Sequence, residues 1–240
     1  MQTKTTAQVQ AVLFDVFGTV VDWRGSLIRF LTSFGNERGF SADWAGLVDA
    51  WRGAYQPSLE PIRAGKRPFV TLDVLHRESL DALLPTFGLE AINESDRELV
   101  SRSWRWLDPW PDSIPGLSRL KRKTISATLS NGGVGLLVDM ARFSELPWDT
   151  VFSADLFRTY KPDPAVYLGA CELLGLRPES ILMVAAHSSD LAAARTCGLQ
   201  TAFVERPHEY GTRRVEEPGH NEHWDYRVTS LEELASHLGT

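Results

Sequence analysis

The sequence predicts an α/β fold built on a parallel β-sheet, with a second, helical unit inserted after the first strand. Short apolar runs rich in Val, Ile, Leu and Phe alternate with helical stretches, and such runs suit strands that are buried on both faces. One long interval, from about Trp23 to Trp110, contains no such run but carries several amphipathic helical patterns. We therefore expect a core formed by residues 1–22 and 111–240, and a helical insert formed by residues 23–110.

The core is expected to contain strands and helices in alternation. The strands are AVLF at 11–14, ISATL at 125–129, ILMVAA at 181–186 and TAFVE at 201–205. Capping residues and a first-turn proline predict helices beside them. These helices are expected from Asp163-Pro164 to Gly175, from Asp190 to Gly198 and after the capping box of Ser230 and Glu233.

The insert is expected to be a bundle of helices rich in tryptophan. The helical patterns run from Trp44 to Tyr55, from Thr71 to Leu80 and from Ser95 to Trp104. Six of the eight tryptophans lie in this insert or at its edges. Large aromatic side chains either pack a core or line an apolar cavity, and the sequence leaves both roles open.

Composition excludes several classes of protein and partner. With 240 residues, of which 43% are hydrophobic and 23% charged, the chain is neither a disordered protein nor a disulfide scaffold. The 25 Lys and Arg residues against 31 Asp and Glu residues give a net charge of −6 without a basic run, so nucleic acid is not an expected partner. No apolar stretch is long enough to predict a membrane span, and the polar start lacks a signal-peptide core, so we expect a cytoplasmic protein.

Polar residues follow three of the predicted strands at the point where each strand ends. Asp15 follows the first strand, Ser130 and Asn131 follow the second, and the segment from His187 to Asp190 follows the third. The carboxyl ends of parallel strands form the edge at which ligands bind, so these side chains are expected to meet there. At such a position Asp15 is either a nucleophile or the cap of a turn.

Four ordered motifs resemble those of the haloacid dehalogenase superfamily. They are D-V-F-G-T at 15–19, S-N-G at 130–132, Y-K-P-D-P at 160–164 and H-S-S-D at 187–190. Together with Val166-Tyr167 and the position of the insert, they resemble the type II L-2-haloacid dehalogenases over nearly the whole chain. The resemblance implies a Rossmann-like core, a helical cap at 23–110, and hydrolysis of short 2-haloalkanoic acids to 2-hydroxy acids.

Phe17 separates this reading from the phosphatases of the superfamily, which carry a second Asp at that position. A phosphate ester needs a general acid and usually Mg²⁺, whereas a halide ion leaves without a proton. Asp190 also lacks an acidic neighbour at position 189 or 191 that would help to hold a hard cation. We therefore expect no metal and no cofactor. A Mg²⁺-dependent phosphatase and a catalytically silent protein that binds small acids remain the alternatives.

The resemblance also implies roles for the motif residues in catalysis. Asp15 attacks C2 of the substrate, expels the halide with inversion and forms an aspartyl ester. Water activated by Asp190, with Lys161 alongside, then hydrolyses that ester, and Thr19 orients Asp15. Tyr167 either supports this site or packs in the core.

Substrate binding is assigned to donors at the strand ends and in the insert. Ser130 and the backbone N–H groups of Val16 and Phe17 are expected to hold the substrate carboxylate. By resemblance, Arg52 and Asn131 hold the halide ion, although a helix arginine is also a common solvated surface residue.

The fourth motif departs from the pattern that many type II enzymes share. Ala185 lacks a hydroxyl group, His187 replaces an amide, and Ser189 replaces a bulky aromatic side chain, which predicts a roomier or repacked pocket. His187 is expected either to bond to Lys161 or Asp15 or to become charged near neutral pH. A homodimer is expected from the resemblance alone.

Overall fold

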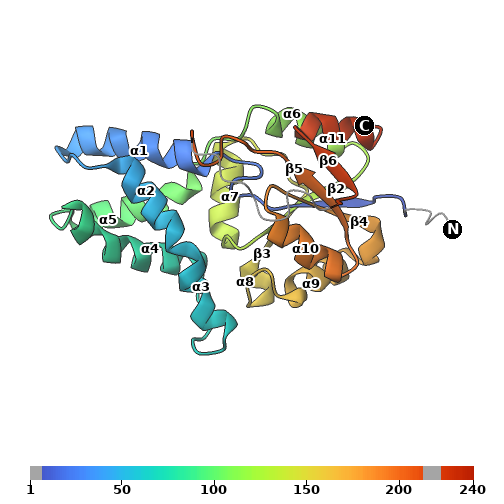
Figure 1. Ribbon diagram of the computed structural model, residues 1–240, viewed down its shortest axis with the longest axis horizontal. Coiled ribbons are helices and arrows are strands. Elements are labelled where there is room, and N and C mark those ends of the chain that lie inside the picture. The colour runs from blue at the N-terminus through green and yellow to red at the C-terminus, as the bar shows by residue number, and fades with distance from the viewer. Residues whose placement is uncertain (1–6, 213–222) are drawn as a thin grey trace.

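The computed structural model describes residues 7–212 and 223–240, and its centre is a parallel sheet of six strands. The strands lie in the order β3-β2-β1-β4-β5-β6 (Figure 1). Their bounds are β1 (Ala11–Phe14), β2 (Ile125–Ser130), β3 (Thr150–Ser153), β4 (Ile181–Ala185), β5 (Gln200–Val204) and β6 (Tyr226–Val228). The strand order reverses between β1 and β4, which is the position where open α/β sheets bind their ligands.

The sheet confirms the predicted fold class and the four predicted strands. Every residue of β1 is buried, because the strand lies between β2 and β4 with helices on both faces. Val12 and Phe14 face one layer of helices, and Ala11 and Leu13 face the other. The two edge strands β3 and β6 were not predicted. They are short and carry half-buried residues, so they lack the continuous apolar run that marks the inner strands.

Two layers of helices cover the sheet. Helices α6 (Ser113–Leu120), α7 (Val134–Phe143) and α11 (Leu231–His237) contribute buried residues to one face. Helices α9 (Pro164–Leu174) and α10 (Ser188–Thr196) contribute to the other, and the short α8 (Ala154–Phe157) and η3 (Pro178–Ser180) precede α9 and β4. The three predicted core helices are confirmed as α9, α10 and α11. The side chain of Asp163 caps α9, and Ser230 caps α11, as the sequence indicated.

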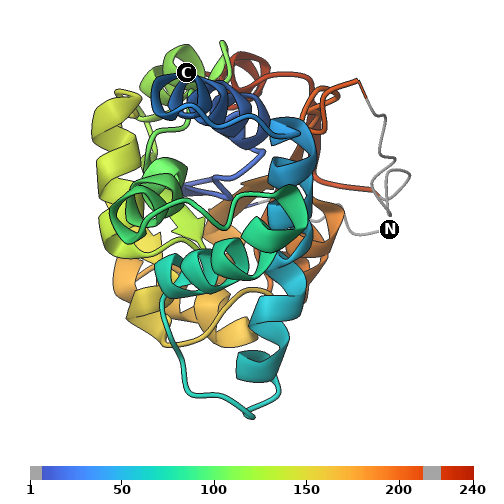
Figure 2. The same cartoon turned by 90° about the vertical axis from the view of Figure 1, so that its left-hand side faces the viewer.

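Between β1 and α6, the regular elements of the described chain are helices, apart from the isolated bridges of Val21 with Phe17 and Pro109. They are α1 (Trp23–Arg38), α2 (Trp44–Gly53), α3 (Tyr55–Arg63), α4 (Leu72–Leu83), η1 (Leu84–Phe87), α5 (Glu94–Ser101) and η2 (Arg102–Arg105). They lie beyond the carboxyl ends of the strands, and they face the viewer in Figure 2. The helix that was expected to open at Ser95 begins at Glu94, because the side chain of Asn93 accepts a hydrogen bond from the backbone of Asp96. The division of the chain at residues 22 and 110 stays a prediction.

The tryptophans of the insert both pack a core and line a cavity. Trp104 lies between the rings of Trp23 and Trp51 and stacks on His76, with ring centroids 4.3 Å apart. Trp23, Trp51 and Trp104 are all buried, and Trp23 also borders the cavity described below. Within residues 7–212 and 223–240, no helix combines the length and the apolar character that crossing a membrane requires.

Candidate active site

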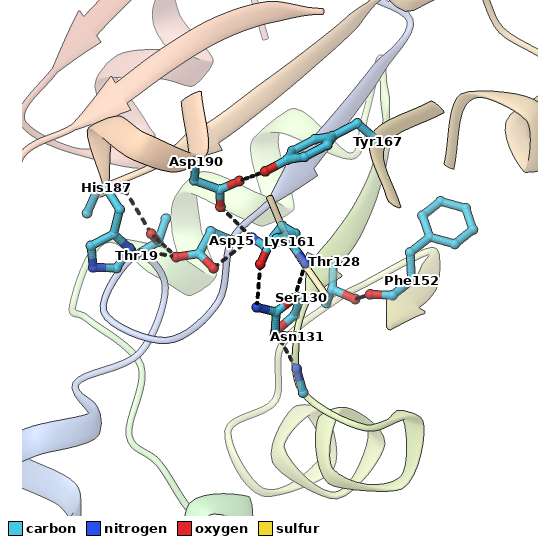
Figure 3. Close-up of polar contacts among 12 residues, drawn as sticks. Asp15, Thr19, Thr128, Ser130, Asn131, Phe152, Lys161, Tyr167, His187 and Asp190 are labelled. Carbon is cyan, nitrogen blue, oxygen red and sulfur yellow. Dashed lines mark hydrogen bonds and ion pairs between the residues drawn. The ribbon is translucent and has the colours of Figure 1, made fainter. Parts of the chain in front are cut away.

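The polar residues predicted at the strand ends meet at the reversal point of the sheet. Asp15 directly follows β1, and its backbone N–H donates to the carbonyl of Val184 in β4 at 3.0 Å. Asn131 follows β2, and His187 and Asp190 follow β4. Figure 3 shows these side chains gathered around Asp15, as expected from parallel strands that end at one edge.

Lys161 stands between two buried carboxylates. Its Nζ donates to Oδ1 of Asp15 at 3.0 Å and to Oδ2 of Asp190. The side chains of the three residues are 7%, 11% and 9% exposed, respectively, so water screens these charges poorly. Oδ1 of Asn131 accepts from the backbone N–H of Lys161 at 2.7 Å and thereby holds the loop in place.

This arrangement keeps Asp15 and Lys161 charged. Burial alone raises the pKa of Asp15, but the positive charge of Lys161 and the hydrogen bond from His187 outweigh it and hold that pKa well below its ordinary value. Burial lowers the pKa of Lys161, yet the charges of Asp15 and Asp190 outweigh it and raise that pKa. For Asp190, burial dominates, and the charge of Asp15 adds to it, so its pKa is raised despite Lys161. Asp15 therefore suits a nucleophile, and Asp190 suits a base.

Two hydroxyl groups fix the orientation of the carboxylates. Thr19 Oγ1 donates to Oδ2 of Asp15 at 2.9 Å and accepts from the backbone N–H of Ala186 at 2.9 Å. The hydroxyl of Tyr167 donates to Oδ1 of Asp190 at 2.6 Å. Burial and the charge of Asp190 raise the pKa of Tyr167, so it stays a donor. Tyr167 is also fully buried, so it supports the site and packs in the core at once.

A cavity of about 700 Å³ lies between these residues and the helices of the insert. Residues that border it include Asp15, Phe17, Lys161 and Asp190 from the core and Arg52 and Tyr55 from the insert. The guanidinium of Arg52 stands over the rings of Tyr55 and Trp23, 4.6 and 5.5 Å from their centroids. The structure thus places Arg52 in the cavity wall. Ser189, which stands where many type II enzymes carry a bulky aromatic side chain, also borders the cavity.

Some of the residues predicted to bind the substrate carboxylate or the halide do not border the cavity. Ser130 and Val16 are buried and do not border the cavity, and Oγ of Ser130 accepts from the backbone N–H of Gly132. Asn131 borders the cavity, but its amide nitrogen already donates to the hydroxyl of Tyr55 and the carbonyl of Lys161. The contacts of Ser130, Val16 and Asn131 with substrate or halide therefore stay predictions.

His187 joins Asp15 to a carboxylate that sequence reasoning missed. Its Nδ1 lies 3.1 Å from Oδ2 of Asp15, and its Nε2 lies 3.0 and 3.1 Å from the two carboxylate oxygens of Glu209. Burial lowers the pKa of His187, but Glu209 and Asp15 outweigh it and raise that pKa well above its ordinary value. Of the two partners expected for His187, Asp15 is the one that it contacts. The raised pKa favours the charged form of the imidazole.

Glu209 lies in the loop after β5 and is only 3% exposed. Trp23 Nε1 donates to its Oε1 at 3.0 Å, and the charge of His187 holds the pKa of Glu209 below its ordinary value against burial. Gly18, at φ +86°, makes room for this carboxylate, because a Cβ there would lie 2.2 Å from Oε1. No motif marks Glu209; the available signal was its place beyond the end of a predicted strand.

The donor set suits a charged organic substrate better than a metal ion. Across the residues that the structure describes, no group of three or more His, Cys, Asp or Glu side chains is arranged to hold a metal. The ammonium of Lys161 occupies the space between Asp15 and Asp190 in which a cation would bind both carboxylates. The arrangement offers a buried, ionised carboxylate beneath a cavity with cationic side chains at its wall, which suits attack on an anionic substrate.

The chain is similar to known proteins over most of its length. The family model described as haloacid dehalogenase-like hydrolase matches residues 9–198. The (S)-2-haloacid dehalogenase 4A of Burkholderia cepacia is 31% identical over 210 residues, which cover 84% of this chain and 87% of that protein.

Two solved structures extend the likeness to the whole fold. A defluorinating L-2-haloacid dehalogenase superposes with a TM-score of 0.94 at 41% identity, covering 100% of this chain and 99% of the other. The L-2-haloacid dehalogenase of Xanthobacter autotrophicus, solved with chloropropionic acid covalently bound, gives a TM-score of 0.80 at 25% identity, covering 95% of this chain and 98% of the other.

Proposed function

The chain belongs to the haloacid dehalogenase-like hydrolases, and on that basis we propose that it cleaves the carbon–halogen bond of short (S)-2-haloalkanoic acids. The products are a halide ion and a 2-hydroxy acid. The observation that carries this function is the ammonium of Lys161 held between Asp15 and Asp190 beneath the cavity. Phe17, at the position of the second Asp of the phosphatases, supports the same choice because a halide leaves without an acid.

In the first step, Asp15 attacks C2 of the substrate and the halide departs. Its lowered pKa keeps the carboxylate ionised at neutral pH. Oδ1 accepts a bond from Lys161, whereas Oδ2 accepts from both Thr19 and His187, so Oδ1 keeps more of its lone-pair density for attack. The Cα–Cβ–carboxylate geometry is fixed before substrate arrives, which favours a near-attack arrangement.

In the second step, water attacks the carbonyl carbon of the aspartyl ester, and Asp190 accepts the proton. The raised pKa of Asp190 makes it the better base of the two carboxylates. Support for a covalent intermediate comes from the Xanthobacter autotrophicus relative, which was solved with chloropropionic acid covalently bound. Lys161 bonds to both Asp15 and Asp190, so it is placed beside the groups that react in both steps.

The substrate is an anion, and the cavity wall offers cationic and amide donors for it. Arg52 is the proposed halide partner, because its guanidinium is oriented by the rings of Tyr55 and Trp23. For the substrate carboxylate, the backbone N–H of Phe17 is the proposed partner that belongs to a residue of the cavity wall. Ser130 and the backbone N–H of Val16 lie outside this wall, and their contacts stay predictions. Residues 23–110 act as a cap over the site in this proposal, and the cytoplasmic location and the homodimer stay predictions from family resemblance.

A halide-release panel tests this function. Purified protein is incubated with fluoro-, chloro- and bromoacetate and with both enantiomers of 2-chloropropionate, in the presence of EDTA, and free halide is measured. We expect halide from the L but not the D enantiomer, an inverted product, and none from Asp15→Asn. Release of phosphate from a generic phosphate ester with Mg²⁺, without halide from any haloacid, would establish the phosphatase instead. Thermal stabilisation by haloacids without turnover would establish the binding protein.

A further inference from the structure

Asp15, His187 and Glu209 form a continuous hydrogen-bonded chain, and the hydrolysis step described above gives this chain no role. The three residues come from the end of β1, the end of β4 and the loop after β5. The side chain of His187 is 16% exposed and that of Glu209 is 3% exposed. A buried imidazole whose two ring nitrogens both contact carboxylates is a donor at both positions, so it carries a positive charge and has no lone pair with which to act as a base.

The two oxygens of Asp15 have different surroundings. Thr19 and His187 both contact Oδ2, at 2.9 and 3.1 Å, whereas Lys161 contacts Oδ1 at 3.0 Å. Figure 3 shows Thr19 and His187 on one side of the Asp15 carboxylate and Lys161 on the other. When Oδ1 forms the ester bond, Oδ2 becomes the carbonyl oxygen of that ester. This oxygen gains negative charge when water attacks.

We propose that His187, kept protonated by Glu209, forms with Thr19 the oxyanion hole for hydrolysis of the aspartyl ester. The proposal rests on the proposed function. Water adds to the ester carbonyl carbon, its proton passes to Asp190, and the carbonyl electron pair moves to Oδ2, where the imidazolium and the Thr19 hydroxyl stabilise it. The carbonyl then re-forms, and the bond from the carbonyl carbon of Asp15 to Oδ1 breaks. Oδ1 leaves with the product as its hydroxyl oxygen and takes the proton from Asp190. The remaining acid proton leaves to solvent and restores the carboxylate.

Glu209 keeps His187 protonated during hydrolysis of the ester, when Asp15 carries no charge. In the free enzyme, two anions, Asp15 and Glu209, face the imidazole of His187. Once Asp15 is esterified it is neutral, so Glu209 is the anion that still contacts the ring. Arg52 acts on Glu209 and lowers its pKa. Other charged residues also border the cavity and have partners of their own: Lys161 and Asp190 bond to each other, Arg63 donates to the carbonyl of Lys161, and Asp49 pairs with Arg24. The raised pKa of His187 is consistent with this arrangement.

The surroundings of Glu209 are built to hold its carboxylate at this place. The indole of Trp23 donates to Oε1, and Gly18 leaves the space that a side chain would fill. The loop that carries Glu209 is anchored by Arg206, which donates to the carbonyl of Thr19 and forms a bidentate pair with Asp112. The loop after β5 is therefore tied directly to the catalytic segment that follows β1.

The variants Glu209→Gln and His187→Ala test the proposal, with Glu205→Gln as a matched control. Glu205 belongs to the same loop, but its carboxylate pairs with Arg227 at the surface. Each protein is mixed with chloroacetate or L-2-chloropropionate and quenched in acid at short times. Halide is counted per enzyme, and the peptide that contains Asp15 is analysed by mass spectrometry for the ester. Unfolding curves confirm that each variant is folded.

We expect a burst of one halide per enzyme in both variants, followed by slow turnover with the ester accumulated on Asp15. Loss of an oxyanion donor slows such steps by about 10²- to 10³-fold, and His187→Ala is expected in that range for ester hydrolysis. Glu209→Gln lowers the pKa of His187, so His187 loses its proton at a lower pH than in the parent enzyme. The pH above which ester hydrolysis slows is therefore expected to be lower in this variant. The alkylation step of the two variants is expected to keep the pH profile of the parent enzyme. The control Glu205→Gln is expected to keep that profile as well.

The outcomes separate the proposal from the function on which it rests. A parent enzyme that releases halide, with variants that show no burst, no accumulated ester and no shift of the hydrolysis profile, overturns the oxyanion role alone. An equal loss in alkylation and hydrolysis also overturns it, because that result indicates a purely structural role. A parent enzyme that releases no halide from any haloacid overturns the proposed function and this inference together.

Discussion

Replacing Lys161 by Met removes the cation from between two buried carboxylates and keeps most of the side-chain volume. The side chain of Lys161 is 7% exposed, and its Nζ bonds to Asp15 and Asp190. Each hydrogen bond to a charged group contributes ~1.5–3 kcal/mol, and breaking a buried ion pair costs ~3–5 kcal/mol because the remaining charge stays buried. We therefore expect Lys161→Met to lower the free energy of unfolding by ~3–5 kcal/mol near neutral pH and to abolish halide release.

The loss is expected to depend on pH with a definite sign. In the parent protein the pKa of Asp15 is lowered, so its contribution to stability is present above the unfolded pKa of about 4 and is lost as pH falls through the lower folded value. Without Lys161, the two carboxylates repel each other, and the pKa of the pair rises above the unfolded value. The destabilisation of Lys161→Met is then largest between the pKa of the carboxylate pair and the unfolded lysine pKa of about 10.4, above which the parent protein progressively loses the contribution of Lys161. It shrinks as pH falls and the pair takes up a proton.

Urea unfolding at about pH 8 and about pH 5 measures both quantities, and the parent protein is run at each pH. Lys121→Met is the matched control, since Lys121 pairs with Asp149 at 2.9 Å with both side chains more than 30% exposed. An exposed pair contributes about 0–1 kcal/mol, so the control is expected to stay within that range. A Lys161→Met protein within about 1 kcal/mol of the parent at both pH values would refute the reasoning.

Three further substitutions test separate parts of the site. Gly18→Ala places a Cβ against Glu209 at φ +86°, so we expect a loss of at least ~1 kcal/mol in urea unfolding and a lower rate of halide release; unchanged values would contradict the close approach. Tyr167→Phe removes a donor that lowers the pKa of Asp190, so the acid limb of the rate profile is expected to move to higher pH, and a fixed limb would argue against Asp190 as the base. Arg52→Met removes one of the cations at the cavity wall and is expected to raise KM for chloroacetate roughly tenfold or more, about 1.4 kcal/mol. An unchanged KM and kcat would contradict a role of Arg52 in binding.

The core of the site was predictable because its residues stand in short motifs at the ends of apolar strands. Asp15 and Asp190 follow β1 and β4, and a parallel sheet brings such positions to one edge whatever the intervening sequence does. Lys161 lies in a loop, and only the resemblance of its motif identified it. The four inner strands were equally visible, since burial on both faces requires a continuous apolar run.

The rest depended on contacts between distant segments that no local pattern encodes. Glu209 reaches His187 through the loop after β5, and its neighbour Gly18 seemed to be an ordinary turn glycine. The edge strand β3 was missed because half of its residues are partly exposed, which weakens the apolar signal. Arg52 was marked as a site residue by resemblance alone, because the helical pattern by itself does not show that α2 lies against the cavity.

Val21, just before α1, and Pro109, just before α6, form an isolated antiparallel bridge outside the named strands. The backbone N–H of Asp22 donates to the carbonyl of Asp108, so these two segments lie side by side. Everything between them is one contiguous stretch of sequence, and that stretch holds Arg52 of the cavity wall but not the reacting carboxylates. The wall of the cavity is thus shared, because Arg52 and Tyr55 of this stretch lie across it from Phe17 and Ser189 of the core. Substitutions in the stretch therefore reshape one side of the cavity and leave Asp15, Lys161 and Asp190 in place.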